Sequence, residues 1–312
     1  MTAPLATASR RRFSGAGRPW VPYAFVAPFT VLFLVFLVAP IIVGVLNSLF
    51  SRKSSGLGFG GTSVEFTGLE NFIRVFADED FLLGFPRVIL YGLIQVPVMM
   101  IIAAALALLF DSALVRAKRF FQFAVFLPYA VPTVIAALLW GFLYQPSVSP
   151  LLQFLSSFGV DIDLLGPGTV WFAIGNINLW SLIGINMIIL FSALQSVPRE
   201  MYEAARIDGA GEVRTALQVK LPMITPAVLL TTLSSVIGTL QLFNEPQVLQ
   251  SITSNIPSDF TPNMAIYATS TLGKNANLSS AMAVVLGLAT LIVSLLLLAA
   301  NRANAKAATD GI

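Results

Sequence analysis

The stretch EAARIDGAGEVRTALQVKLP, from Glu203 to Pro222, is the longest closely charged segment in an otherwise apolar chain. Long uncharged runs lie on either side of its six charged residues, which are Glu203, Arg206, Asp208, Glu212, Arg214 and Lys220. Charged side chains are costly in the hydrocarbon core of a membrane, so a segment of this kind is expected in a loop between two apolar helices.

A helical hairpin is predicted over residues 198–222. Pro198 suits the first turn of a helix, and Asp208-Gly209 stops that helix, because glycine adopts the left-handed conformation of a helix C-terminus without steric cost. A second short helix is predicted from about Glu212 to Val219, closed by Leu221-Pro222. The two helices would lie on the membrane surface.

The composition places the chain among integral membrane proteins. Of its 312 residues, 56% are hydrophobic and 11% are charged, with a mean hydropathy of +0.83, whereas soluble domains have about a quarter charged residues. The chain has no cysteine and no histidine, which excludes disulfides, Cys/His metal sites and Cys or His nucleophile–base pairs. The acidic residues are scattered, so no metal or other cofactor is expected on this chain.

Six uncharged runs are long enough to cross a bilayer, which takes about 20 apolar residues. They fall within residues 18–52, 87–111, 119–161, 163–199, 220–245 and 274–302. The predicted fold is therefore all-α and polytopic, with six transmembrane helices.

The distribution of Lys and Arg predicts the orientation of these helices. With the N-terminus inside, thirteen Lys and Arg residues fall on the cytoplasmic side and five on the other, so both termini and the 198–222 hairpin are predicted to be cytoplasmic. The predicted parts are a basic tail (1–18), a first transmembrane helix (19–50), an extracytoplasmic loop (51–85), a core with five transmembrane helices (86–300) and a tail (301–312). Arg10 to Arg12 also resemble a twin-arginine signal, but the apolar segment that follows is too long for a cleavable signal.

The extracytoplasmic loop ends with GLENFIRVFADEDF, residues 68–81. Leu69, Phe72, Ile73 and Phe76 have helical spacing, which predicts a short interfacial helix. A plain loop covering the bundle is the alternative, and the sequence does not separate the two.

Small residues, namely Ala204, Ala205 and Gly209, give the hairpin a face with little side-chain bulk. A hairpin that only contacts lipid would instead carry Trp, Phe and several Lys. The composition leaves an amphipathic loop on the headgroups open, but this face favours docking into a cleft of a cytoplasmic protein.

The spacing of Glu203-Ala204-Ala205, Gly209, Val219 and Leu221-Pro222 resembles the EAA loop of binding-protein-dependent ABC importer permeases, with Val219 in place of isoleucine. The resemblance implies a type I ABC importer transmembrane domain whose loop forms the coupling helices, in a bacterial cytoplasmic (inner) membrane protein that is a transport subunit and not an enzyme. The implied coupling residues are Glu203, Ala204, Ala205, Asp208, Gly209, Leu221 and Pro222. The implied partners are a second six-span permease, two ABC ATPase subunits and an extracytoplasmic sugar-binding protein, with membrane lipid around the spans and no nucleic acid. No P-loop sequence occurs, so ATP and Mg²⁺ are expected on the ATPase.

Polar residues within the predicted spans point to a cargo route. Pro128 and Pro132 should bend the third span, and Tyr129 and Thr133, four residues apart, share a face. The fourth and fifth spans add Asn176, Asn178, Trp180, Ser181, Asn186, Ser235, Thr239, Gln241, Asn244 and Glu245. Any one of these could instead join helices by hydrogen bonds, but as a set, hydroxyl and amide groups beside aromatic rings suit a polyol.

LPYAVPTV, GLENF and Phe243-Asn244-Glu245 resemble the maltose or glycerol-phosphate type first permease subunit of the carbohydrate branch. This implies that Tyr129, Thr133, Ser235 and Thr239 line a sugar site. Asn244 departs from the usual Phe-Asp pattern, so the cargo stays open among an oligosaccharide, a sugar-like polyol and a glycerol phosphate.

The sequence also has features to compare with two other classes of protein. ARIDGAG resembles part of the motif of CDP-alcohol transferases, but these enzymes need further metal-binding aspartates and none occurs between Asp208 and Asp259. A stand-alone secondary transporter should show inverted repeats and ion-coupling carboxylates within the membrane, and neither is found.

Overall fold

The computed structural model describes residues 20–54, 62–112 and 115–310. The chain divides into two units, Met1–Leu46 and Asn47–Ile312, which are described separately below. The predicted basic tail, residues 1–18, lies outside the described residues.

The first unit holds the first apolar helix, which consists of α1 (Val21–Phe33), the π-helical turn η1 (Leu34–Val38) and the start of α2 (Ala39–Ser48). Neither α1 nor η1 has a buried residue, as expected where lipid surrounds a helix. The π turn lies directly before Pro40, and the Ala39 N–H donates to the carbonyl of Leu34. The extra residue in this turn accommodates a proline, which can neither donate a hydrogen bond nor approach the carbonyl four residues earlier.

Across the described residues, five helices are long and apolar enough to span a membrane, and a bent pair makes up to six. Besides the N-terminal helix they are α4 (Glu79–Asp111), α8 (Val170–Gln195), α12 (Thr225–Leu240) continued by α13 (Asn244–Leu249), and α15 (Ala276–Asp310). The bent pair joins α5 (Lys118–Phe126) and the turn η3 (Leu127–Ala130) to α6 (Thr133–Leu143) at an angle of 97°. The all-α prediction is confirmed, and α15 continues as a helix to Asp310, within the predicted tail.

The bend lies where the two prolines of the third run predict it. Val131 has an extended ψ angle of 125°, because the residue before a proline avoids the helical region. Pro132 is also extended, with a ψ of 134°. Pro132 then precedes α6, where its missing N–H costs nothing.

Helix α4 forms the centre of the second unit and packs against α8 and α12. It begins at Glu79, eight residues before the charge that bounds the second apolar run, because the Asp78 carboxylate accepts the Phe81 N–H at 3.0 Å and caps the helix. Gly175 lets α8 approach α4 closely, since a Cβ there would lie 2.9 Å from Oε1 of Gln95. Nε2 of Gln95 donates to the Gly175 carbonyl at 3.1 Å.

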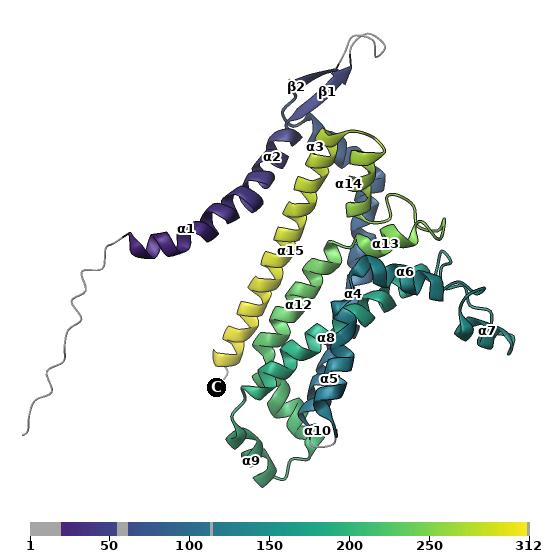
Figure 1. Cartoon of the computed structure of the whole chain (residues 1–312). Coiled ribbons are helices and arrows are strands. Elements are labelled where there is room, and N and C mark those ends of the chain that lie inside the picture. Colours follow the sequence, from purple (N-terminus) through teal and green to yellow (C-terminus); the bar gives the residue numbers. More distant parts are fainter. Residues whose placement is uncertain (1–19, 55–61, 113–114, 311–312) are drawn as a thin grey trace, which may run out of the picture. The chain divides into compact units, whose positions relative to one another are not determined.

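The segment between α2 and α4 contains two strands that the sequence did not predict. β1 (Phe50–Ser54) and β2 (Thr62–Phe66) pair antiparallel, with Phe50 opposite Phe66. Buried Asn71 holds the segment together, because its Nδ2 donates to the carbonyls of Ser48 and Phe50 at 2.8 Å each. In Figure 1, the pair lies at the end of the second unit opposite α9.

Helix α3 (Glu70–Ala77) confirms the helix predicted at the end of the loop. Val75 is buried beside Phe81 and Met282, whereas Ile73 and Phe76 are exposed. An exposed apolar side is what an interfacial helix needs, and its position at the membrane surface stays a prediction. The remaining helices are α7 (Pro150–Ser156) and α14 (Pro262–Thr271), which packs on α15.

Candidate functional site

The charged stretch forms a helical hairpin between α8 and α12, as predicted. Helix α9 (Arg199–Ile207) begins after Pro198 and ends before Gly209, whose φ of +76° is the left-handed conformation expected there. The N–H of Ala210 donates to the Ala205 carbonyl at 2.9 Å and closes the turn. The chain returns through α10 (Glu212–Thr215), the π turn η4 (Ala216–Lys220) and α11 (Leu221–Met223).

The prediction that Leu221-Pro222 closes the second helix is wrong. The helix continues to Met223, and the break comes at Ile224, with φ −95° and ψ 9°. The Leu221 N–H donates to the carbonyl of Ala216, five residues earlier. This wider turn accommodates Pro222 within a helix, in the same way as η1 accommodates Pro40.

The predicted coupling residues differ in accessibility. Glu203, Ala204, Asp208, Gly209 and Pro222 are exposed, Leu221 is half-buried and Ala205 is buried. Apolar side chains accompany the exposed ones, because Ile207 is 86%, Val213 73% and Leu217 58% exposed. The hairpin therefore exposes charged and apolar side chains together.

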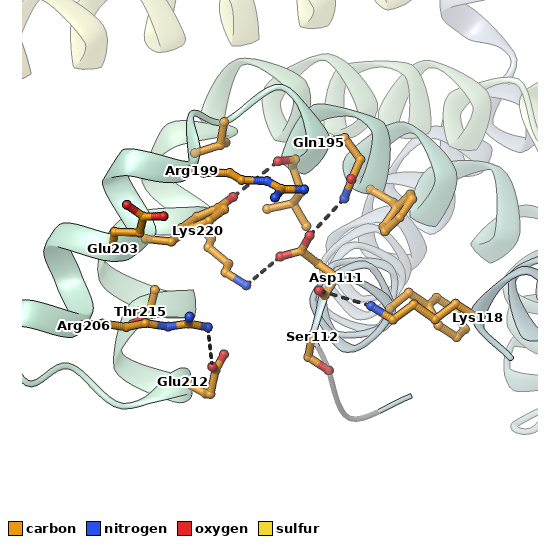
Figure 2. A pocket seen from close by; sticks show the side chains of 15 residues that line it. Asp111, Ser112, Lys118, Gln195, Arg199, Glu203, Arg206, Glu212, Thr215 and Lys220 are labelled. Atoms are coloured by element: carbon orange, nitrogen blue, oxygen red, sulfur yellow. Dashed lines mark hydrogen bonds and ion pairs between the residues drawn. The ribbon is translucent and has the colours of Figure 1, made fainter. Parts of the chain in front are cut away.

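A buried ion pair joins the returning half of the hairpin to the end of α4. Nζ of Lys220 lies 2.6 Å from Oδ2 of Asp111, and their side chains are only 9% and 12% exposed. Nε2 of Gln195, at the end of α8, donates to Oδ1 of Asp111 at 3.0 Å, and Lys220 lies 5.0 Å from the centroid of the Tyr202 ring. Figure 2 shows Gln195 and Lys220 converging on Asp111.

These contacts connect three helix ends that are distant in sequence. Burial, with the nearby Asp111 carboxylate as a second cause, raises the pKa of the Tyr202 phenol above its ordinary value of 10.0. In the sequence, Asp111 and Lys220 only mark the ends of apolar runs, and no local pattern shows that they pair.

A cavity of about 610 Å³ lies beside this ion pair. Glu203, Arg206 and Glu212 line it from the hairpin, and Lys118 lines it from the start of α5. Arg206 and Glu212 pair at 3.4 Å on the surface (Figure 2). Among the described residues, none forms an ion pair with Glu203, so its carboxylate is available to a partner.

A second cavity, of about 430 Å³, lies among the spanning helices and is lined mainly by α4, α8, α12 and the segment that leads into α13. Eight of the predicted pathway residues line it: Tyr129, Asn178, Asn186, Ser235, Thr239, Gln241, Asn244 and Glu245. Thr133 lies next to the lining, since its Oγ1 accepts a hydrogen bond from Nδ2 of Asn244 at 3.2 Å.

Three predicted pathway residues lie away from this cavity. Asn176 lines a different cavity, and its Nδ2 donates to the Tyr144 hydroxyl at 2.8 Å. Trp180 packs edge-on against Trp140, with ring centroids 6.0 Å apart, beside the apolar core. Ser181 is 2% exposed, and its hydroxyl has no hydrogen-bond partner among the described residues.

Helix α4 supplies lining residues that the sequence interpretation missed. Tyr91, Gln95 and Met99 repeat every four residues along one face of the helix and line the cavity. The Tyr91 hydroxyl accepts a hydrogen bond from Nδ2 of Asn178 at 3.0 Å, and Sδ of Met99 accepts one from Nδ2 of Asn186 at 3.2 Å. The spacing of Tyr91 and Gln95 within an apolar run matches that of Tyr129 and Thr133 and could have indicated them.

Comparison with known proteins is consistent with this arrangement. The family described as binding-protein-dependent transport system inner membrane component matches residues 99–309, which include the entire hairpin. The sn-glycerol-3-phosphate transport system permease protein UgpA of Salmonella typhi is 32% identical over 278 residues, covering 88% of this chain and 92% of the relative. UgpA of Escherichia coli O6:K15:H31 is 32% identical over 274 residues, covering 86% and 89% of the two chains.

The fold also matches a solved structure, described as a bacterial ABC transporter involved in the import of the acidic polysaccharide alginate. The TM-score is 0.77 at 23% identity, over 91% of this chain and 96% of that one. The curated relatives are transport permeases, so the enzymatic alternative is set aside. The chain therefore belongs to the family of binding-protein-dependent transport system inner membrane components.

Proposed function

We propose that this chain is the permease subunit of an ATP-driven importer for a sugar or sugar-like polyol. It would pair with a second six-span permease, two ABC ATPase subunits and an extracytoplasmic sugar-binding protein. ATP and Mg²⁺ would bind to the ATPase, and this chain would supply the cargo route and the mechanical connection to it.

The observation that carries this proposal is the anchored hairpin. Its outer surface combines the unpaired Glu203 carboxylate with exposed Ile207, Val213 and Leu217. Apolar anchors with a charged group beside them are typical of protein interfaces. The Asp111–Lys220 ion pair ties the returning half of the hairpin to α4, so a displacement of the hairpin would be transmitted to a spanning helix.

The cargo would pass through the 430 Å³ cavity. Tyr129 is 46% exposed and presents its ring there, and amide, hydroxyl and carboxylate groups from α8 and α12–α13 surround it. A mixed aromatic and polar wall suits a molecule with apolar ring faces and polar edges.

The test is uptake by the assembled importer carrying Glu203→Lys or Gly209→Asp. Both variants should insert normally, because Glu203 is exposed and both positions lie in the hairpin, outside the spanning helices. Asp at position 209 also strains the turn of the hairpin, since the φ of +76° favours glycine. We expect loss of ATP-dependent uptake and weaker co-purification of the ATPase. Asp161→Lys, which reverses an exposed acid outside the hairpin, is the matched control and should behave as wild type. Normal uptake by the two hairpin variants would contradict the proposal.

A further inference from the structure

We propose that a groove between α4 and α8 binds an anionic phospholipid, whose phosphate contacts Arg87 and whose acyl chain lies along α4. The groove is a cavity of about 520 Å³. It is distinct from the 430 Å³ cavity proposed for the cargo, although Tyr91 and Gln95 line both. The lipid site therefore does not depend on which cargo the chain carries.

The wall of the groove is apolar along most of its length. Leu90, Ile94 and Val98 follow one another at intervals of four residues, so they lie on one face of α4, and all three are exposed. From α8, the apolar lining residues are Trp171, Phe172 and Leu179. An exposed apolar strip between two spanning helices suits a hydrocarbon chain.

The polar groups on this wall hold the helices together. Nε2 of Gln95 donates to the Gly175 carbonyl at 3.1 Å, and Nδ2 of Asn176 donates to the Tyr144 hydroxyl at 2.8 Å. The surface that stays open in the groove is mainly apolar. A polar solute is therefore a poor match for the groove, whereas an acyl chain fits it.

Arg87 gives one end of the groove a positive charge, and it is the only charged residue among the described residues that line it. Its Nη1 contacts the carbonyl and Oδ2 of Asp259 at 3.4 and 3.5 Å, which is longer than the about 2.7–2.9 Å of a strong charge-assisted bond. No described residue accepts a hydrogen bond from its Nε or Nη2. These two nitrogens form one edge of the guanidinium, and such an edge can bind two phosphate oxygens.

The length of the groove matches one leaflet of a bilayer. Arg87 and Val98 are 11 positions apart, which corresponds to about 16 Å at about 1.5 Å per helical residue. One leaflet contributes half of a hydrocarbon core of about 30 Å. Arg87 and Asp111 also bound the second apolar run, so Arg87 lies at headgroup level in the leaflet opposite the hairpin.

Charge and hydrogen bonding favour an anionic lipid over the other molecules that could cover this groove. A zwitterionic headgroup would bring its own ammonium group close to the Arg87 cation, whereas phosphatidylglycerol brings only a negative charge. An apolar helix of the second permease would remove Nε and Nη2 of Arg87 from water without offering them an acceptor, which is costly.

The experiment uses the natural lack of cysteine in this chain. Leu93→Cys and Ile101→Cys are labelled with bimane in the assembled importer, whose other subunits are also made free of cysteine. Both positions are 68% exposed on α4 and neither lines the groove, but Leu93 is next to Ile94. The complex is placed in phosphatidylcholine vesicles that contain phosphatidylglycerol or phosphatidylcholine with a nitroxide at the same acyl carbon.

The measured quantity is the ratio of quenching by nitroxide phosphatidylglycerol to quenching by nitroxide phosphatidylcholine, which cancels differences in depth between the two labels. We expect a ratio of about two or more at Leu93→Cys, since a basic residue at the membrane surface enriches anionic lipid, and about one at Ile101→Cys, which has no cation beside it. Equal ratios at the two positions would overturn the proposal. Weak quenching by both lipids at Leu93→Cys would show that the second permease covers the groove, and would overturn it as well.

The role of Arg87 is tested in the same assay. Adding Arg87→Gln to Leu93→Cys should lower the ratio to about one, because glutamine has no charge to attract the lipid. Arg74→Gln, which changes an exposed arginine on α3, is the control and should leave the ratio unchanged. An unchanged ratio in Arg87→Gln would refute the contact between Arg87 and phosphate, and the ratio at Leu93→Cys alone tests the groove if Arg87→Gln fails to assemble.

Discussion

Replacing Lys220 by methionine should loosen the returning half of the hairpin from α4. Lys220 Nζ and Asp111 Oδ2 are 2.6 Å apart and almost fully buried. Removing one partner of a buried ion pair typically costs about 3–5 kcal/mol, because the other charge stays buried without compensation. In Lys220→Met the Asp111 carboxylate retains its hydrogen bond from Gln195, and water can reach it through the adjacent cavity. We therefore expect the lower end, about 3 kcal/mol.

Hydrogen exchange of the hairpin amides, followed by mass spectrometry on the permease without ATPase, measures this loss directly. If the hairpin opens as a local unit, a loss of about 3 kcal/mol in its opening free energy makes amide exchange roughly 100-fold faster, because each factor of ten corresponds to about 1.4 kcal/mol. The affected peptides should cover residues 212–223, while those in the middle of α8 should be unchanged.

The hairpin also contains its own control. Arg206 and Glu212 form an ion pair at 3.4 Å with side chains 71% and 63% exposed, and exposed pairs contribute about 0–1 kcal/mol. Arg206→Met should therefore accelerate exchange by less than about fivefold. If Lys220→Met and Arg206→Met exchange alike, the anchoring role assigned to the Asp111–Lys220 pair is wrong.

Changing the charge of each partner in turn tests whether the ion pair itself, and not the packing around it, holds the hairpin to α4. Asp111→Asn should lower the stability of the hairpin less than Lys220→Met does, because the asparagine oxygen can still accept a hydrogen bond from Lys220. Lys220 also keeps its contact with the Tyr202 ring at 5.0 Å. Contacts of this type contribute about 0.5–2 kcal/mol. The exchanged pair, Asp111→Lys with Lys220→Asp, should recover part of the protection lost in Lys220→Met. No recovery would indicate that packing and not charge holds the hairpin.

Two further substitutions test contacts that position the membrane helices. Gly184→Ala should lower the free energy of unfolding by about 1–3 kcal/mol, because a Cβ on Gly184 would lie 2.3 Å from the backbone oxygen of Val125, and backbone moves less easily than a side chain. Gly238→Ala is the control, since nothing lies within 4 Å of a Cβ there. Equal melting temperatures of the two variants would contradict the close approach of α8 to the Val125 backbone. Asn71→Ala should make the segment around the β1–β2 pair sensitive to protease, since it removes the Nδ2 group that donates to the carbonyls of Ser48 and Phe50. Loss of such a side-chain hydrogen bond typically costs about 1 kcal/mol. Unchanged cleavage would show that the strand pairing is sufficient.

Much of the membrane architecture could be predicted because it depends on short stretches of sequence. Hydropathy alone separates the spans, since a helix must satisfy its own backbone in lipid. Pro128 and Pro132 predict the bend in the third run, because proline restricts the residue before it and removes a donor. Gly209 predicts the turn of the hairpin through its tolerance of a positive φ.

The same local rules also account for the errors. Pro222 should end the helix, because proline has no N–H to donate and its ring clashes with the carbonyl four residues earlier. One extra residue in the preceding turn makes room for the ring, and the helix continues. The strands β1 and β2 lie in the segment predicted as an extracytoplasmic loop, and Asn71, which contacts the start of this segment, lies twenty residues after Ser51 in the chain.

By itself, the sequence determined a helical membrane protein with a charged hairpin whose spacing is that of an importer coupling loop. Only the tertiary structure decided that Lys220 pairs with Asp111, 109 residues earlier, and that Tyr91 and Asn178 meet in the wall of the cavity between the spanning helices. Hydropathy and turn chemistry act between neighbouring residues and can be read along the chain. The partners of a buried charge or amide depend on which helix faces meet, and packing between distant helices sets that.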